Sequence, residues 1–164
     1  MFNPARETDI IDICAIERGP GYEDLVGRWP AEQHLLEMKS PGSAYFVWRQ
    51  DAGIEGFVML QHLGNANNAA LLRRIAVRRP GIGTGRLLLA ETLRWVFEET
   101  TTNRLALNVF VENEHARRTY LTQGFTLEGT QREVVWTSDG RYRSQHMMSM
   151  LRSEWRVSAG SSGR

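Results

Sequence analysis

Three glycines at alternate positions, Gly81, Gly83 and Gly85, separate a stretch with the pattern of a strand from one with the pattern of a helix. Because glycine has no Cβ, a backbone built from it lets a bulky group approach closely. A helix that begins in such a turn directs free N–H groups and the positive end of its dipole into the turn. The segment therefore predicts a cradle for a phosphate or pyrophosphate, and its alternative is a tight turn without a ligand.

Neither of the two common nucleotide loops fits this segment. The dinucleotide fingerprint G-x-G-x-x-G needs its third glycine where Arg86 or Leu88 stands, and the P-loop G-x-x-x-x-G-K-[ST] needs a lysine that this segment lacks. The expected phosphate ligand therefore belongs to another class of cofactor.

A second set of polar side chains lies on the next predicted helix. Asn113 and Tyr120 are seven residues apart, close to two helical turns, so they share one face of that helix. A side-chain amide at the helix start and a phenol two turns later are placed to hold an extended ligand. Both belong to the pattern N-x-x-A-x-x-x-Y-x-x-x-G-F, which the chain matches at Asn113, Ala116, Tyr120, Gly124 and Phe125.

These two motifs, in this order, resemble the GNAT superfamily of N-acetyltransferases. That family pairs a pyrophosphate loop of the form Q/R-x-x-G-x-G/A with the second pattern, and the leucines that follow align its glycines with Gly83 and Gly85. Pro80 stands where the family usually has Gln or Arg, which leaves the backbone cradle intact and removes one side-chain contact. The resemblance covers residues 9–151, and a weaker cue in residues 127–142 is closest to the branch that acetylates N-terminal amines of ribosomal proteins.

The resemblance implies acetyl-CoA as cosubstrate and a primary amine as acceptor, which attacks the thioester directly while both are bound. Tyr120 is then the expected catalytic acid for the leaving thiolate, since its reference pKa of about 10 suits a weak donor. The expected cofactor contacts are the strand backbone along the pantetheine, the N–H groups under the pyrophosphate and the amide at the helix start. They are Ile75, Ala76, Val77, Ile82, Gly83, Thr84, Gly85, Arg86 and Asn113.

No strong general base is evident in the sequence. Residues 71–77, the strand before the loop, contain no carboxylate. Glu112 is a candidate substitute acting through water, although an exposed acid that stabilises a helix N-terminus is the default reading. An α-amine has a pKa of about 8 against about 10.4 for lysine, so it needs less help from a base. We therefore expect an amine of low pKa, such as a protein N-terminus, as acceptor. An antibiotic or polyamine acetyltransferase and a non-catalytic acyl-CoA-binding domain stay open as alternatives.

The elements that position these residues follow from the spacing of apolar side chains. The pattern predicts helices over 8–17, 30–38, from the glycine loop to 99 and from 113 to 123, and strands over 44–49, 54–63, 71–77, 104–111, 126–136 and 142–151. This order predicts an α/β (α+β) fold, a mixed sheet with helices on both faces. The resemblance further implies a mostly antiparallel sheet with a splayed strand pair. One domain over 1–152 and a flexible C-terminal tail over 153–164 are expected.

Composition narrows the classes of partner. The 164 residues carry 20 Lys+Arg and 19 Asp+Glu, a net charge of +1, which argues against a general nucleic-acid or polybasic membrane binder. An arginine-rich nucleic-acid binder remains the alternative of that kind, through Arg73, Arg74, Arg78 and Arg79. With Arg86, the same arginines fit a local cationic cleft for CoA.

The remaining residues with chemical potential have plain expectations. The lone Cys14 and the absence of an apolar leader or membrane-length run predict a cytoplasmic protein. The four histidines lack metal-ligand spacing, so no metal is expected. Glu23, Asp24 and Trp29 lie in an early loop where a cationic acceptor can bind, although a solvated loop is the default. Homodimers are common among proteins of this kind, so a homodimer is possible.

Overall fold

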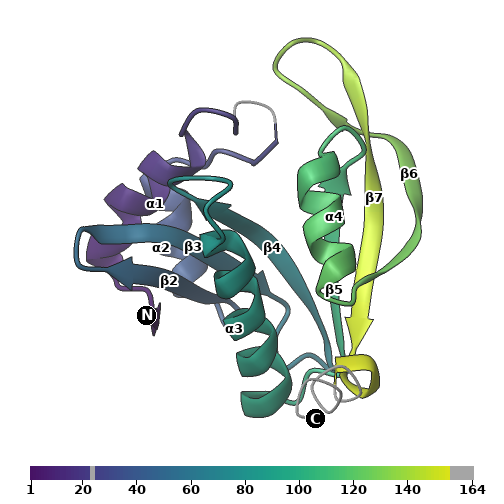
Figure 1. Cartoon of the computed structure of the whole chain (residues 1–164), viewed down its shortest axis with the longest axis horizontal. Helices are drawn as coiled ribbons and strands as arrows, with labels where there is room; N and C mark the ends of the chain where they lie inside the picture. The colour runs from purple at the N-terminus through teal and green to yellow at the C-terminus, as the bar shows by residue number, and fades with distance from the viewer. Residues whose placement is uncertain (23–24, 156–164) are drawn as a thin grey trace.

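One seven-stranded sheet runs through residues 1–22 and 25–155, the part of the chain that this computed structural model describes. Its spatial order is β1-β2-β3-β4-β5-β7-β6 (Figure 1). The strands are β1 (Phe2–Pro4), β2 (Ala44–Gln50), β3 (Gly53–Gln61), β4 (Ala69–Val77), β5 (Arg104–Phe110), β6 (Thr126–Trp136) and β7 (Tyr142–Leu151). The helices are α1 (Ile10–Glu17), α2 (Ala31–Met38), α3 (Thr84–Glu99) and α4 (Glu114–Thr122), with a 3-10 helix η1 (Glu7–Asp9) before α1.

The β4–β5 pair is the parallel pair of this sheet, and it opens along its length. Pairing begins at Ala69 with Arg104 and ends at Leu71 with Ala106, although β4 continues to Val77. Figure 1 shows the two ribbons diverging from that point. The other neighbouring strands are antiparallel. The expected mostly antiparallel sheet with a splayed pair is therefore confirmed.

Helices cover both faces, because successive side chains of a strand point to opposite sides of the sheet. On β3, Phe57 and Met59 pack in one cluster with α1. The alternate residues Val58 and Leu60 pack in the other cluster, under α3 and α4. The apolar face of α3 that the sequence predicts, which includes Leu93 and Val96, is buried in this second cluster. The prediction of helices on both faces is confirmed.

Two features at the ends of the chain were not anticipated. Phe2–Pro4 forms β1, an edge strand antiparallel to β2. At the other end, residues 152–155 are helical, and Trp155 packs against Phe97 with ring centroids 5.7 Å apart. The start of the expected tail at 153 is therefore part of the packed structure, and residues 156–164 lie outside the described residues.

None of the helices in the described ranges is long and apolar enough to span a membrane.

Candidate active site

The glycine loop forms an open backbone cradle at the start of α3. Gly81 and Gly83 have φ values of +87° and +90°, which L side chains rarely adopt. A Cβ at either position would meet no atom within 4 Å, so the space above the loop is open. Within the described chain, the N–H groups of Ile82, Gly83, Thr84 and Gly85 have no acceptor. They form the donor set that an anion at a helix N-terminus requires.

Arg86 enters this cradle in a different way from the one expected. Its N–H donates to the Gly83 carbonyl oxygen at 3.1 Å, so its backbone is used inside the turn. The side chain is exposed and can still reach a phosphate. The expectation of a free N–H at Arg86 is therefore wrong, because the first turn of the helix closes on Gly83.

Glycines also bring the loop close to the end of β4. A Cβ on Gly85 would lie 3.7 Å from Val77 Cγ1, an ordinary contact. A Cβ on Gly56 of β3 would lie only 3.0 Å from the Ala76 carbonyl oxygen and 3.2 Å from Leu88 Cδ2. Small residues at these positions let α3 begin directly over the strand whose backbone is expected to hold the cosubstrate.

The β4 backbone alternates in direction beyond the point where β5 departs. Arg78 N–H donates to the Glu55 carbonyl oxygen of β3 at 2.7 Å, and the Ala76 carbonyl oxygen faces Gly56. In a regular strand the backbone groups of alternate residues point to opposite neighbours. Those of Ile75 and Val77 therefore face the splay, as the pantetheine role requires. The expected backbone contact at Ala76 is wrong, because its polar groups are paired with β3.

The Val77 donor already has a partner from a distant loop. Its N–H donates to the Tyr22 hydroxyl oxygen at 3.0 Å. Tyr22 lies after α1, and burial raises its pKa. The spacing of residues did not point to Tyr22, and an aromatic residue in the loop with Trp29 was the only signal.

Tyr120 projects from α4 into the second core cluster. The residue is 8% exposed, and its ring lies edge-on to Phe125 with centroids 5.7 Å apart. None of the described residues hydrogen-bonds to its hydroxyl, which leaves that O–H for a ligand. Burial, and to a smaller extent the nearby Tyr22 phenol, raises the pKa of Tyr120. The phenol is therefore protonated at neutral pH and acts as a hydrogen-bond donor.

Asn113 has a structural role that leaves part of its amide available. Its Oδ1 accepts from the Ala116 N–H at 3.2 Å, so it is the N-cap of α4. The amide NH2 retains its donors. A cap and a ligand contact are compatible in this one side chain.

Glu112, the candidate base, is tied to the β7 strand. Arg143 donates to Glu112 Oε2 at 3.2 Å, and hydrogen bonds from the Glu112 backbone and from Arg143 lower the pKa of Glu112. A carboxylate with a lowered pKa is a poor proton acceptor. Glu112 therefore carries little base function.

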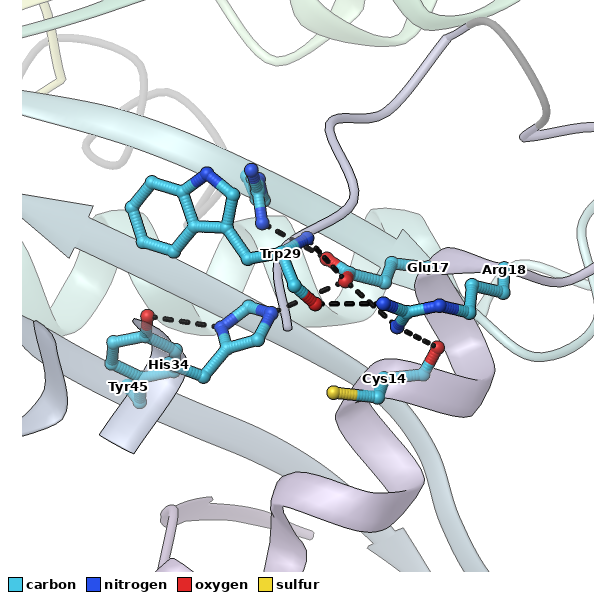
Figure 2. Close-up of polar contacts among 7 residues, drawn as sticks. Cys14, Glu17, Arg18, Trp29, His34 and Tyr45 are labelled. Carbon is cyan, nitrogen blue, oxygen red and sulfur yellow. Dashed lines mark hydrogen bonds and ion pairs between the residues drawn. The ribbon is translucent and has the colours of Figure 1, made fainter. Parts of the chain in front are cut away.

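The structure also brings together a buried polar cluster that motif reading did not find. Figure 2 shows Glu17 and His34 reaching one another, with Tyr45 on the far side of the imidazole. His34 lies 3.2 Å from Glu17 Oε1 through Nε2 and 3.2 Å from the Tyr45 hydroxyl through Nδ1. Arg74 Nη1 donates to Glu17 Oε2 at 2.9 Å. Glu17 and His34 are fully buried, so this cluster compensates its own charges.

The same carboxylate anchors the loop between α1 and α2. The Trp29 N–H donates to Glu17 Oε1 at 2.9 Å, and Arg18 donates to the Trp29 carbonyl oxygen at 2.7 Å (Figure 2). The Arg74 guanidinium lies over the Trp29 ring, 4.3 Å from its centroid. Trp29 is thus a packed anchor, and the acceptor candidates Glu23 and Asp24 lie outside the described residues.

Cys14, Glu17 and His34 have potential ligand atoms within 4.8 Å of one another. The Glu17 carboxylate already accepts from Arg18 and Arg74. Two guanidinium groups at this distance repel a metal cation. The donor set therefore fits an internal ion-pair network better than a metal centre.

The arginine cluster is largely neutralised. Arg78 pairs with Asp12, Arg79 pairs with Glu55, and Arg74 is buried against Glu17. Among the described residues, Arg73 and Arg86 make no direct ion pair, although the charge of Arg73 helps to lower the pKa of Glu37. The expected cationic cleft therefore has fewer unpaired positive charges than the sequence suggests. The nucleic-acid alternative loses three of the four arginines on which it depended.

Comparisons with known proteins agree with this geometry. The family model described as acetyltransferase (GNAT) family matches residues 11–125. A spermidine N-acetyltransferase from Vibrio cholerae, in complex with CoA and spermine, has a TM-score of 0.84 and 20% identity over 95% of this chain and 97% of its own. The ribosomal-protein-S18-alanine N-acetyltransferase from Escherichia coli has a TM-score of 0.77 and 22% identity over 92% of each chain. No curated protein matches the sequence. At these identities, the TM-scores show that the three chains share a fold.

Proposed function

The chain belongs to the GNAT family of acetyltransferases, and we propose that its acceptor is the N-terminal α-amine of a protein. The enzyme uses acetyl-CoA as the acetyl donor. The splay between β4 and β5 is the proposed site of transfer: the Val77 N–H faces it and donates to Tyr22, and the Tyr120 phenol is close enough to Tyr22 to be influenced by it.

The pyrophosphate of acetyl-CoA is proposed to lie on the N–H groups of residues 82–85, with the Arg86 side chain beside it. The pantetheine extends along the backbone groups of Ile75 and Val77, and Asn113 donates from its amide. Support comes from the open space above the loop and from the β4 backbone that faces the splay. Holding donor and acceptor together supplies much of the rate acceleration in such a reaction.

In the transfer step, the neutral amine nitrogen forms a bond to the thioester carbon, and the carbon–sulfur bond then breaks. Backbone N–H groups of β4 stabilise the negative charge on the carbonyl oxygen. The proton of the amine passes to water. Tyr120 donates its O–H to the leaving sulfur, and because its pKa is raised it stabilises the thiolate mainly as a hydrogen-bond donor.

The proposed acceptor is inferred mainly from one observation: the described part of the splay has no available basic carboxylate. On β4, Arg73 and Arg74 occupy positions where a carboxylate could act as a general base. Glu112 has a lowered pKa, and the Glu17 carboxylate already accepts hydrogen bonds from Trp29 and Arg74. A site without a strong base favours an amine that is partly neutral at pH 7. An α-amine meets this requirement better than a lysine or a polyamine.

Charge on the described surface also weighs against a polyamine. Two acids near the β6–β7 hairpin are paired with arginines, Glu112 with Arg143 and Asp139 with Arg141. A polycation binds best where carboxylates are unpaired. These pairs offer no net negative surface.

Thiol release from acetyl-CoA tests the proposal on three acceptors. One is a peptide with a free N-terminus, one is the same peptide with a blocked N-terminus and an internal lysine, and one is spermidine. After the background rate without acceptor is subtracted, we expect thiol release with the first peptide and not with the other two acceptors. Release only with the lysine or with spermidine contradicts the proposed acceptor. Binding of CoA without turnover on any amine indicates a non-catalytic acyl-CoA-binding domain.

We also propose that the protein acts in the cytoplasm, which suits the free thiol of Cys14. A homodimer is proposed as well. Support comes from the edge strand β6, which exposes Val134 and Trp136 to solvent. Sedimentation equilibrium measures the mass in solution, and a monomer at micromolar concentration contradicts the dimer.

A further inference from the structure

The Tyr22 hydroxyl lies at a backbone position that the proposed function gives to the pantetheine arm of acetyl-CoA. The Val77 N–H donates to this hydroxyl at 3.0 Å. β5 has left β4 before Val77, since their pairing ends at Leu71 with Ala106. The phenol oxygen therefore stands where the carbonyl oxygen of a neighbouring strand would accept. Because the Tyr22 phenol also raises the pKa of Tyr120, the two phenols lie near one another.

A ligand that pairs with the Val77 backbone needs the space that this hydroxyl fills. An amide that pairs along a strand edge places its carbonyl oxygen about 2.9 Å from the N–H nitrogen. The Tyr22 oxygen already lies 3.0 Å from the Val77 nitrogen. One N–H makes one well-aligned hydrogen bond, so two oxygen atoms exclude one another there. The exclusion applies to the pantetheine itself, whatever group the sulfur of CoA carries.

The backbone on either side of Tyr22 is held by its own turn. The Tyr22 N–H donates to the Gly19 carbonyl oxygen at 3.2 Å, and the Leu25 N–H donates to the Tyr22 carbonyl oxygen at 3.2 Å. The ring packs against the core cluster that contains α1. The hydroxyl is at the far end of this ring, so a rotation of the side chain moves it away from Val77 while the turn stays in place.

We propose that Tyr22 closes the pantetheine site at Val77 in the free enzyme, and that CoA and acetyl-CoA alike displace its hydroxyl when they bind. The inference rests on the proposed use of the β4 backbone by acetyl-CoA. In the free enzyme the contact satisfies an N–H that would otherwise lack an acceptor. It lowers the apparent affinity for either ligand, because only the open fraction of the protein binds. A nucleotide without the pantetheine arm does not reach Val77 and is unaffected.

Calorimetric titration with CoA and with 3′-phospho-ADP, the part of CoA that lacks the pantetheine arm, tests this inference. Phenylalanine in Tyr22→Phe keeps the ring and removes the hydroxyl. We expect the Kd of CoA to fall by about 2- to 12-fold in this variant, the range of one net hydrogen bond, and the Kd of 3′-phospho-ADP to stay unchanged. Tyr142→Phe, which removes an exposed phenol, should change neither. An unchanged or raised Kd for CoA, or an equal gain for 3′-phospho-ADP, overturns the inference.

A second measurement uses the wild-type chain and does not depend on the stability of Tyr22→Phe. In protein labelled with 15N-valine, the Val77 amide resonance is assigned by its loss in Val77→Ile. We expect saturating CoA and acetyl-CoA to move this resonance, whereas 3′-phospho-ADP leaves it near its free position. If CoA binds neither wild type nor Tyr22→Phe, the proposed function fails. If CoA binds and leaves the Val77 resonance in place, only the displacement of Tyr22 is contradicted.

Discussion

Replacing Glu17 with glutamine should destabilise the protein strongly, because the change leaves charge uncompensated inside the core. Both Glu17 and His34 are inaccessible to solvent, and Arg74 is 6% exposed. A glutamine amide also turns an N–H2 toward donors that Glu17 now satisfies. Removing one partner of a buried ion pair costs about 3–5 kcal/mol. For a chain of this size that corresponds to a fall in Tm of roughly 6–20 °C.

Asp12→Asn is the matched control, since it makes the same carboxylate-to-amide change in an exposed pair. Asp12 lies 2.8 Å from Arg78, and the two side chains are 48% and 41% exposed. Exposed pairs of this kind contribute less than about 1 kcal/mol. The comparison therefore isolates burial as the cause of the loss.

Urea unfolding followed by tryptophan fluorescence and by far-ultraviolet circular dichroism measures both variants. Trp29, one of five tryptophans, stacks on Arg74, so its part of the fluorescence change reports on the cluster. Adding Arg74→Met to Glu17→Gln should recover part of the lost stability, because the unpaired guanidinium is then absent. Equal losses in Glu17→Gln and Asp12→Asn would refute the reasoning from burial.

Three further predictions concern the site. Tyr120→Phe should lower kcat by about 10²-fold or more while the Kd of acetyl-CoA stays within about twofold, measured by thiol release and calorimetry; unchanged turnover removes Tyr120 from the mechanism. Gly83→Ala should weaken acetyl-CoA binding and cost about 1–2 kcal/mol of stability, whereas Gly53→Ala, at a φ of +120° in the β2–β3 turn, should cost stability and leave the Kd unchanged. Burial raises the pKa of Tyr120 above its ordinary value of 10.0, so the phenol stays protonated as pH rises. We therefore expect kcat/KM to increase as the acceptor amine loses its proton, and not to fall before pH exceeds about 10. A descending limb near pH 8 contradicts this assignment.

Most of the fold could be predicted from local patterns in the sequence. The alternation of β3 side chains and the apolar stripe of α3 determine which residues are buried, because both depend on the period of a single element. The Asn113 cap and the turn at Gly83 are equally local. Their backbone conformations follow from residue types within one helical turn, so the cradle and the face of α4 were predictable.

Errors in the predicted site came from backbone hydrogen bonds, which residue types do not reveal. The backbone of Ala76 is turned to β3 and the N–H of Arg86 is closed on Gly83. Which alternate residues of β4 face the splay depends on its register with β3, and an irregularity between Met59 and Leu60 of β3 shifts that register within the pair. The arginine cluster was misleading for a related reason, since Asp12, Glu17 and Glu55 reach it from other elements.

The sequence by itself determined the family, the glycine turn before α3 and the phenol on α4, because each is a short run of residues whose spacing suits one helix or one turn. Tertiary structure alone decided the partners of those groups. Tyr22 meets Val77 across 55 positions of the chain, and Arg74 meets Glu17 across 57. These contacts exist because α1 and its following loop pack over the β4 strand where β5 departs. No period in the sequence encodes that meeting, since it depends on the path of the chain between the two elements.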